Sequence, residues 1–329
     1  MTSKTKQITA VLIGAGKIGV GYDSVATYTG PSLSHLRALQ QAVNVVHIDV
    51  IDPDENRLSE VKGLPKVRKC LSAPEKQLLI DADVIVIASP TSTHAGLLSL
   101  IWEIDKSDNP IICEKPTSSS ETDLKVVGSL PLQFTNRVFV NYSRQWSTDH
   151  KQISEVIANK SLGSLNFVSC IYDKGLLNNG VHLIDFLKTL LGDQIDLTWI
   201  GNSIFDTGSE NPTLSFNLMF GSIPVFIVGN DARNYSIFEI KFYFENGTLE
   251  LKDSGRELLT ENTKNHGVYK DYTVLERTSR KTTDLTCSMD KMYEEILRGK
   301  ATSNFQKAIE TERFCLQILQ SHKDAQTQR

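Results

Sequence analysis

The chain has 329 residues, of which 40% are hydrophobic, and a formal net charge of −4. This length and apolar content allow a buried core and favour two domains over one. The mildly acidic balance argues against a nucleic-acid-binding protein. No apolar run approaches the roughly 20 residues that a transmembrane helix needs, which argues against a membrane protein.

Cysteine usage and the N-terminus indicate the compartment. The five cysteines are scattered and form no C-x-x-C pair, which argues against a disulfide framework and against structural zinc. The N-terminal stretch MTSKTKQ lacks the apolar core of a signal peptide. We therefore expect a cytoplasmic protein without a bound metal.

The first part of the chain alternates apolar runs with amphipathic segments. The expected strands are Ile8–Ile13, Val45–Ile51, Val84–Ala88, Ile111–Cys113 and Val138–Val140. The expected helices are Ser32–Ala42, His94–Trp102 and Glu121–Leu130. Apolar strands separated by helices are typical of a parallel sheet covered on both faces. Residues 1–143 are therefore predicted to form a doubly wound α/β domain of the Rossmann type.

The second part, residues 144–329, has a different character. Helices are expected at Ser147–Asn159, Gly180–Leu191 and Asn304–Gln320. Strands are expected at Thr213–Phe220, Ile223–Val228, Phe238–Phe244 and Thr248–Leu251, with a hairpin turn at Asn246-Gly247. The polar segment Gly255–Thr283 has no clear assignment. We predict an α+β domain with a largely antiparallel, open sheet that supplies the substrate pocket and the oligomer contact.

A G-x-G-x-x-G motif, GAGKIG, follows the first strand and predicts a dinucleotide-binding loop. Gly14 permits the tight turn, Gly16 lets the backbone approach a pyrophosphate, and Gly19 permits close helix packing. Backbone N–H groups along the loop, including those of Lys17 and Ile18, are expected to bind the phosphates.

Asp52, at the end of the second strand, is the candidate acceptor for the ribose hydroxyls of NAD, although it also suits a turn. Its distance from Gly19 exceeds the usual spacing of about 20 residues, because the loop Gly21–Pro31 interrupts the first helix. Tyr22 and His35 are candidates for reaching the pocket; the alternative is that they are ordinary loop and helix-start residues.

Two further turns follow strands of the predicted parallel sheet. In SPTSTH, Ser89, Pro90 and His94 are candidate cofactor contacts, and a structural hydrogen bond for His94 is the equal alternative. In EKP, Glu114 and Lys115 lie where ligands bind in such sheets. A confined lysine there can act on a substrate hydroxyl.

The segment KGLLNNGVHLID brings Asn178, Asn179, His182 and Asp185 to one stretch of chain. His182 and Asp185 are three residues apart, so they share a face of the expected helix. Oxidation of an alcohol by nicotinamide needs a base for the hydroxyl proton, and histidine has a suitable ordinary pKa of about 6.5. Lys115 and His182 could supply this chemistry together, while a satisfied core histidine is the alternative.

GAGKIG, Asp52, SPTSTH, EKP and GLLNNGVHLID occur in the order seen in the Gfo/Idh/MocA family, which the chain therefore resembles. The resemblance implies NAD, with NADP possible, as cofactor. It implies that Lys115 contacts substrate and nicotinamide, that His182 is the acid/base, and that Arg144 lies close to the active site. It also implies substrates among sugars, cyclitols and nucleotide sugars, and a homodimer or homotetramer formed through the open sheet.

One departure from the family concerns Asn178, which stands where many members have an aspartate. An amide can hold a substrate hydroxyl but cannot accept a proton, so a relay through this position is in doubt. The first functional hypothesis is a dehydrogenase for a secondary alcohol, or a reductase for the matching ketone. The alternatives are a catalytically silent NAD(P)-binding sensor, and an enzyme that reduces and reoxidises bound NAD within one cycle.

Overall fold

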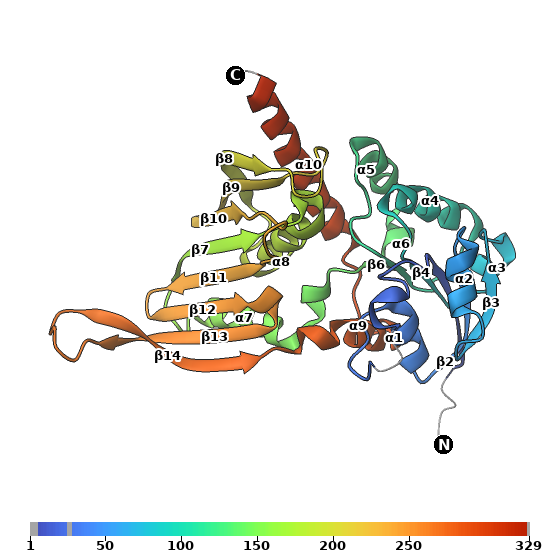
Figure 1. The fold of residues 1–329 in the computed structure, drawn as a ribbon, viewed down its shortest axis with the longest axis horizontal. Coiled ribbons are helices and arrows are strands. Elements are labelled where there is room, and N and C mark those ends of the chain that lie inside the picture. Colours follow the sequence, from blue (N-terminus) through green and yellow to red (C-terminus); the bar gives the residue numbers. More distant parts are fainter. Residues whose placement is uncertain (1–5, 25–27, 328–329) are drawn as a thin grey trace. The chain divides into compact units, whose positions relative to one another are not determined.

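A computed structural model describes residues 6–24 and 28–327, and Figure 1 shows the fold. The chain forms two compact units. The first ends at Ser143 and also includes Thr286–Arg313, whereas the second comprises Arg144–Leu285 and resumes at Phe314. A functional division after residue 143 stays a prediction. The segment Thr286–Arg313, however, which the sequence assigned to the second domain, packs with the first unit.

The first unit contains a six-stranded sheet, and all of its strands are parallel. Its strands are β1 (Ile8–Ile13), β2 (Val45–Ile51), β3 (Val67–Leu71), β4 (Val84–Ile87), β5 (Ile111–Cys113) and β6 (Val138–Val140). Their spatial order is β3-β2-β1-β4-β5-β6, so the winding reverses between β1 and β4. Ligands bind such sheets at the carboxyl ends of the strands beside this reversal. The predicted doubly wound fold is confirmed.

Helices alternate with these strands. They are α1 (His35–Gln41), α2 (Glu55–Val61), α3 (Lys76–Ile80), α4 (His94–Ile104), α5 (Glu121–Gly128), α6 (Leu132–Thr135) and, from the returning segment, α9 (Ser288–Leu297). Helix α1 begins later than predicted because Ser34 caps it, accepting a hydrogen bond from the Arg37 N–H. Met292 and Tyr293 of α9 are buried, and α9 packs on α1.

The second unit contains an eight-stranded sheet in the order β14-β13-β12-β11-β7-β10-β9-β8. Its strands are β7 (Leu165–Tyr172), β8 (Ile195–Ile204), β9 (Thr213–Phe220), β10 (Ile223–Gly229), β11 (Glu239–Phe244), β12 (Gly247–Lys252), β13 (Glu257–Asn265) and β14 (Thr273–Thr282). One pair, β7 with β10, is parallel, and the others are antiparallel. The predicted largely antiparallel sheet is confirmed. The unassigned polar segment Gly255–Thr283 contains the whole hairpin β13–β14.

The helices of the second unit are α7 (Thr148–Asn159), a π-helix (Gly175–Gly180) and α8 (Val181–Leu191). Helix α10 (Phe305–Thr327) begins in the first unit and continues into the second, well past the predicted end at Gln320. Within the described ranges, no helix is both long and apolar enough to cross a membrane.

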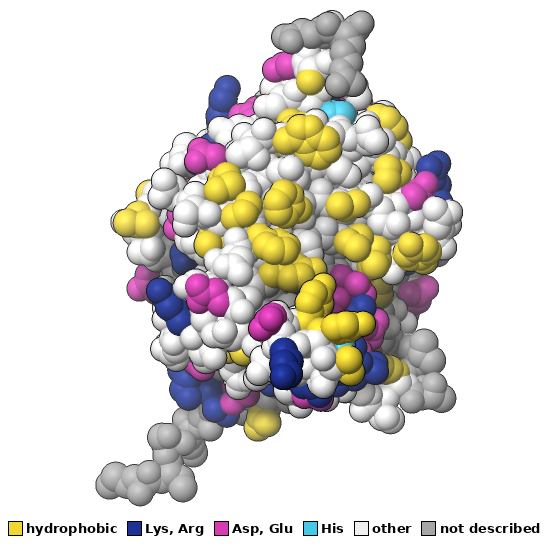
Figure 2. Space-filling view, turned by 90° about the vertical axis from the view of Figure 1, so that its left-hand side faces the viewer, with side chains coloured by type: hydrophobic (Ala, Val, Ile, Leu, Met, Phe, Trp, Pro, Cys, Tyr) yellow, Lys and Arg dark blue, Asp and Glu magenta, His cyan; other side chains and the backbone are white. Residues whose placement is uncertain are grey.

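One face of the second sheet carries exposed apolar side chains. Along β10, Val225 and Ile227 are buried, whereas Phe226 is 44% and Val228 53% exposed. The strand register aligns Phe226 with Trp199 through Asn217, and Val228 with Ile171, so these side chains share a face. We call Ile171, Trp199, Phe226 and Val228 the open apolar face. Figure 2 shows a side of the molecule on which apolar side chains gather.

Candidate functional site

The glycine-rich loop leaves β1 in a conformation that depends on its glycines. Gly14 has φ +104°, and its N–H donates to the Ile51 carbonyl at 2.7 Å. A Cβ at Gly14 would lie 2.5 Å from the Ser89 nitrogen, and one at Gly19 would lie 2.0 Å from the Gly14 carbonyl oxygen. A Cβ at Gly16 would meet no atom within 4 Å. The loop is therefore closed on its protein side and open at Gly16.

Asp52, directly after β2, holds this loop. It is 3% exposed, and its Oδ2 accepts a hydrogen bond of 2.7 Å from the Ala15 N–H. Its Oδ1 accepts another, of 2.9 Å, from the Asp54 N–H. Each carboxylate oxygen has more than one lone pair, so both retain capacity for ribose hydroxyls. Arg57, which the sequence reasoning missed, places Nη1 3.6 Å from Asp52 Oδ2.

The SPTSTH turn is tied to the EKP turn. Ser89 Oγ lies 2.6 Å from Thr93 Oγ1, and Pro90 precedes a short 3-10 turn that leads into α4. His94 is 1% exposed and lies between two carbonyl oxygens, those of Ser89 at 2.8 Å and Pro116 at 2.9 Å. These contacts support the structural alternative for His94. Its role as a cofactor contact stays a prediction.

Glu114 of the EKP turn is bonded inside the first unit. Its Oε1 accepts hydrogen bonds from His35 Nε2 at 2.9 Å and Asn141 Nδ2 at 2.6 Å. His35 is fully buried, and its Nδ1 lies 2.8 Å from the Tyr293 hydroxyl. Burial favours the neutral acid, but the hydrogen bonds from His35 and Asn141 and the charge of Lys115 hold the pKa of Glu114 below its ordinary value. Lys115, the next residue in the chain, is half-buried and is therefore attached to a backbone position that the Glu114 hydrogen bonds hold in place.

The sequence reasoning named His35 but not its partners. Tyr293 comes from α9, which gave no signal of belonging to the first unit, and Asn141 follows β6. Tyr22, the other loop candidate, is 57% exposed.

The candidate acid/base segment of the second unit begins with an unexpected element. A π-helix spans Gly175–Gly180 and leads directly into α8. Such π-turns are rare and occur often at functional sites. The π-helix carries the exposed Asn178 and also Asn179, whose Nδ2 donates to Asp173 Oδ1 at 2.8 Å. His182 is the second residue of α8 and is half-buried.

Asp185, one turn further along α8, lies beside the segment that opens the second unit. Its two carboxylate oxygens accept hydrogen bonds from Gln145 Nε2 at 3.0 and 2.9 Å. Arg144 is 9% exposed, and its guanidinium lies 3.7 Å above the Phe238 ring. Burial lowers the pKa of Arg144 to about 10, and the charge of Asp185 opposes this shift. Among the described residues, no hydrogen-bond partner reaches Arg144 Nε.

Arg144 Nη2 donates to the Ser254 carbonyl at 3.2 Å. Ser254 and its neighbour Asp253 both have positive φ, 61° and 49°, which is uncommon for residues other than glycine. The next residue, Gly255, binds His150 Nε2 through its carbonyl at 2.9 Å. Burial lowers the pKa of His150 to about 4, so the ring is neutral at neutral pH and Nε2–H donates.

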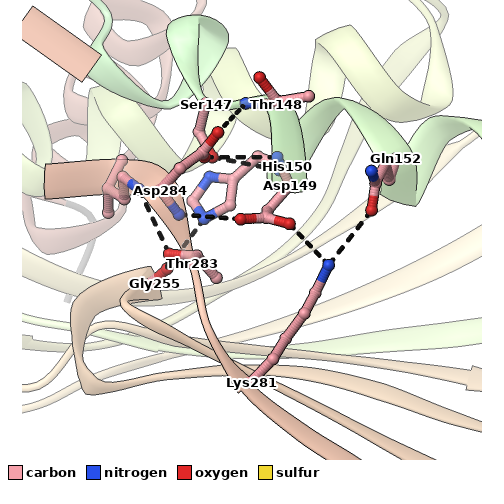
Figure 3. A network of polar contacts seen from close by, with 10 residues as sticks. Ser147, Thr148, Asp149, His150, Gln152, Gly255, Lys281, Thr283 and Asp284 are labelled. Carbon is pink, nitrogen blue, oxygen red and sulfur yellow. Dashed lines mark hydrogen bonds and ion pairs between the residues drawn. The ribbon is translucent and has the colours of Figure 1, made fainter. Parts of the chain in front are cut away.

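A polar network anchors this region (Figure 3). Asp284 accepts hydrogen bonds from the Thr148 N–H at 3.0 Å and from Ser147 Oγ at 2.5 Å. Ser147 is itself the N-cap residue of α7. Asp149 accepts from the Asp284 N–H at 2.8 Å, and its other oxygen lies 2.6 Å from Lys281 Nζ. The end of β14 and the start of α7 are therefore bonded together, next to Arg144.

The structure thus gathers the predicted site residues into two groups. Gly14 and Gly19 belong to the glycine-rich loop, Asp52 and Ser89 lie against it, and His94, Glu114 and Lys115 belong to the same unit. Arg144, Asn179, His182 and Asp185 belong to the second unit. In the part of the chain that the structure covers, no group of three or more His, Cys, Asp or Glu side chains could hold a metal ion.

Comparison with known proteins gives a match for the first unit. An oxidoreductase family with an NAD-binding Rossmann fold, Gfo/Idh/MocA, matches residues 8–142. The inositol 2-dehydrogenase of Pseudarthrobacter chlorophenolicus is 25% identical over 205 residues, which are 58% of this chain and 56% of that protein. The chain therefore spans little more than half of that relative's length.

Solved structures share the fold over nearly the whole chain. A dehydrogenase from Chromobacterium violaceum has a TM-score of 0.72 and 14% identity, with 99% of each chain covered. The 3-ketoreductase KijD10 of Actinomadura kijaniata, solved with NADP and TDP-benzene, has a TM-score of 0.69 and 11% identity, covering 93% of this chain and 95% of that one.

Proposed function

Because residues 8–142 match the Gfo/Idh/MocA family of oxidoreductases, we propose that the chain is an NAD(P)-dependent dehydrogenase. It would oxidise a secondary alcohol of a sugar, cyclitol or nucleotide sugar, or reduce the matching ketone. The observation that carries this proposal is the glycine-rich loop, which is held by Asp52 through the Ala15 N–H and left open at Gly16. The names of similar proteins, inositol 2-dehydrogenase and 3-ketoreductase, support the substrate class.

The residues present fit a dinucleotide. The space beside Gly16 suits the close approach of a pyrophosphate to the backbone, including the N–H groups of Lys17 and Ile18. Asp52 would hold the adenosine ribose, and Ser89 and Pro90 would flank the cofactor beyond β4. The nicotinamide supplies the hydride acceptor or donor. The rest of the chemistry falls to side chains of this chain.

Proton transfer is the task of those side chains. In the proposal, His182 takes the proton of the substrate hydroxyl, and the Lys115 ammonium stabilises the developing alkoxide. Asn178, Asn179, Arg144 and Asp185 would bind and orient the substrate. Arg144 suits an oxygen-rich or anionic substituent, because its buried guanidinium has donor capacity left at Nε.

The test is the reduced-nicotinamide absorbance of the purified chain with NAD or NADP and a panel of cyclitols, sugars and nucleotide sugars, myo-inositol included. Turnover with one class supports the dehydrogenase and identifies its substrate class. NAD binding without any turnover supports the silent sensor. Cofactor retained through purification, with product formed but no net reduction, supports internal recycling of the nicotinamide.

Replacing Asp52 by alanine is expected to narrow the preference for NAD over NADP. The carboxylate repels a 2′-phosphate, and Arg57, whose Nη1 lies 3.6 Å from it, would then be able to meet that phosphate, with Asp54, 3.5 Å from Arg57 Nε, as its remaining carboxylate partner. Affinity for both cofactors is measured by calorimetry. Asp54→Ala, which removes the α2 cap and the other carboxylate partner of Arg57 but leaves Asp52 in place, is the matched control. An unchanged ratio of the two affinities in Asp52→Ala would contradict the assignment of Asp52.

We also propose that the open apolar face joins copies of the chain into a homodimer or homotetramer. Apolar side chains gathered on one side of a sheet are typical of interaction surfaces. The double substitution Phe226→Glu with Val228→Glu is expected to yield monomers in light scattering, because charges cannot be buried there without partners. Val43→Glu, at a 95% exposed valine of the first unit, should leave the assembly intact. A wild-type chain that is already monomeric would refute the proposal.

A further inference from the structure

The two residues after Lys115-Pro116, Thr117 and Ser118, make several hydrogen bonds directly beside the EKP turn. Thr117 and Ser118 are fully buried, and both bind the side chain of Glu312 from α10. Glu312 Oε1 accepts from the Thr117 N–H at 2.8 Å. Oε2 accepts from Thr117 Oγ1 at 2.7 Å, from Ser118 Oγ at 2.8 Å and from the Ser118 N–H at 3.1 Å. The Tyr142 hydroxyl, 3.4 Å from Oε1, adds a fifth donor.

We propose that Glu312 is a positioning residue for Lys115, which it orients by fixing the backbone of the Thr117-Ser118 segment. This inference rests on the proposed function, because it assigns the orientation of the lysine to the catalytic step. Glu312 lies far from the EKP turn in the sequence, in the returning segment of the first unit.

The turn is held on both sides of Lys115. On the N-terminal side, the Glu114 carboxylate is bonded to His35 and Asn141. On the C-terminal side, the Pro116 carbonyl binds His94, and the next two residues bind Glu312. The orientation of a long, flexible lysine side chain depends on the position of the backbone that carries it. Glu312 differs from Glu114 and His94 in that it accepts hydrogen bonds from two consecutive backbone N–H groups, those of Thr117 and Ser118.

The chemistry of these bonds requires a carboxylate. An ionised carboxylate is acceptor-only and can serve two N–H groups, one at each oxygen. A glutamine has one acceptor oxygen and one NH₂ group. Whichever way the amide is turned, its NH₂ faces either the Thr117 N–H or the Ser118 N–H, and that bond is lost. Glu312→Gln therefore disturbs the turn with almost no change in side-chain volume.

The experiment compares Glu312→Gln, Glu312→Asp and the control Glu310→Gln in the full chain. Glu310 is exposed on the same helix, so its variant makes the same chemical change outside the turn. With NAD and the substrate found in the panel, Glu312→Gln is expected to lower kcat roughly 10- to 100-fold, the scale of a small misplacement of a reacting group. The KM and Kd for NAD are expected to stay close to those of the wild type. Glu312→Asp keeps an acceptor-only group and should recover part of kcat.

A second measurement is independent of turnover. Reductive methylation followed by peptide mass spectrometry gives the labelling rate of Lys115 relative to the exposed Lys307. This ratio should change severalfold in Glu312→Gln and match the wild type in Glu310→Gln. If the wild-type chain turns over none of the cyclitols, sugars and nucleotide sugars in the panel, the proposed function fails. The labelling ratio then tests the positioning role by itself. An unchanged ratio overturns the inference. So does a loss of kcat that is matched by an equal loss of NAD affinity and thermal stability.

Discussion

Replacing His182 by alanine is expected to lower turnover by about 10²–10⁴-fold, the usual contribution of a general acid–base group. NAD affinity should be unaffected, since the glycine-rich loop and Asp52 belong to the other compact unit. The physical reason is that no other side chain of the π-helix and α8 segment has an ordinary pKa near neutrality: Asn178 and Asn179 do not titrate, and Asp185 is bonded to Gln145. Steady-state kinetics and calorimetry on one preparation measure both quantities.

His47→Ala is the matched control for this change, because His47 is exposed on β2 and has no proposed role. Lys115→Ala should also lower kcat with NAD binding preserved. If His182→Ala retained full turnover, the acid–base role would pass to another group. If it lost NAD binding as well, the effect would be structural rather than catalytic.

Replacing Gly19 by alanine is expected to destabilise the first unit by about 3 kcal/mol, at the upper end of the usual cost of overpacking. The added Cβ would lie 2.0 Å from the Gly14 carbonyl oxygen, a backbone atom that cannot move aside without displacing the loop. Gly14→Ala should have a similar effect, because φ is +104° there and the Cβ would meet Ala88 and Ser89. Both variants should lose NAD binding together with stability. Denaturant unfolding followed by calorimetry measures the two.

Gly16→Ala separates cofactor binding from folding. Its Cβ meets no protein atom within 4 Å, so stability should change by no more than about 0.5 kcal/mol. NAD affinity should still fall, because the methyl group occupies the space that a pyrophosphate would approach. Gly96→Ala, within α4 and equally free of neighbours, controls for the general effect of alanine. Unchanged NAD affinity in Gly16→Ala would argue against this loop as the phosphate site.

The sequence predicted the apolar strands of the first unit well, because each is a short β-branched run. It missed β3, whose sequence VRKCL carries two charged residues at the edge of the sheet and gives no apolar signal. It also missed β13 and β14, which are paired by backbone hydrogen bonds while many of their side chains are exposed. Strands of this kind are specified by their neighbours more than by their own composition.

The candidate site shows the same limit. Short motifs such as GAGKIG and EKP can be read from the sequence and identify Gly14 and Lys115, and Asp52 is found as the acidic residue after the second strand. The partners that hold these motifs come from distant segments and carry no local signal. Tyr293 and Glu312 look like ordinary residues of surface helices until tertiary packing buries them beside His35 and Thr117. Arg57 and the π-helix were also missed, although Arg57 lies close in sequence to Asp52 and the π-helix lies within the GLLNNGVHLID segment.

Because the first unit is built from two separate stretches of the chain, recombination can exchange it only if both stretches move together. The family match is one uninterrupted stretch, residues 8–142, and it invites the view of a portable module. The folded unit, however, also includes α9 and Glu312, which belong to the later stretch Thr286–Arg313. A recombination event that exchanged the N-terminal stretch alone would pair His35 and Thr117 with a foreign helix. Viable chimaeras should therefore carry both stretches together, and crossover points between them should be selected against.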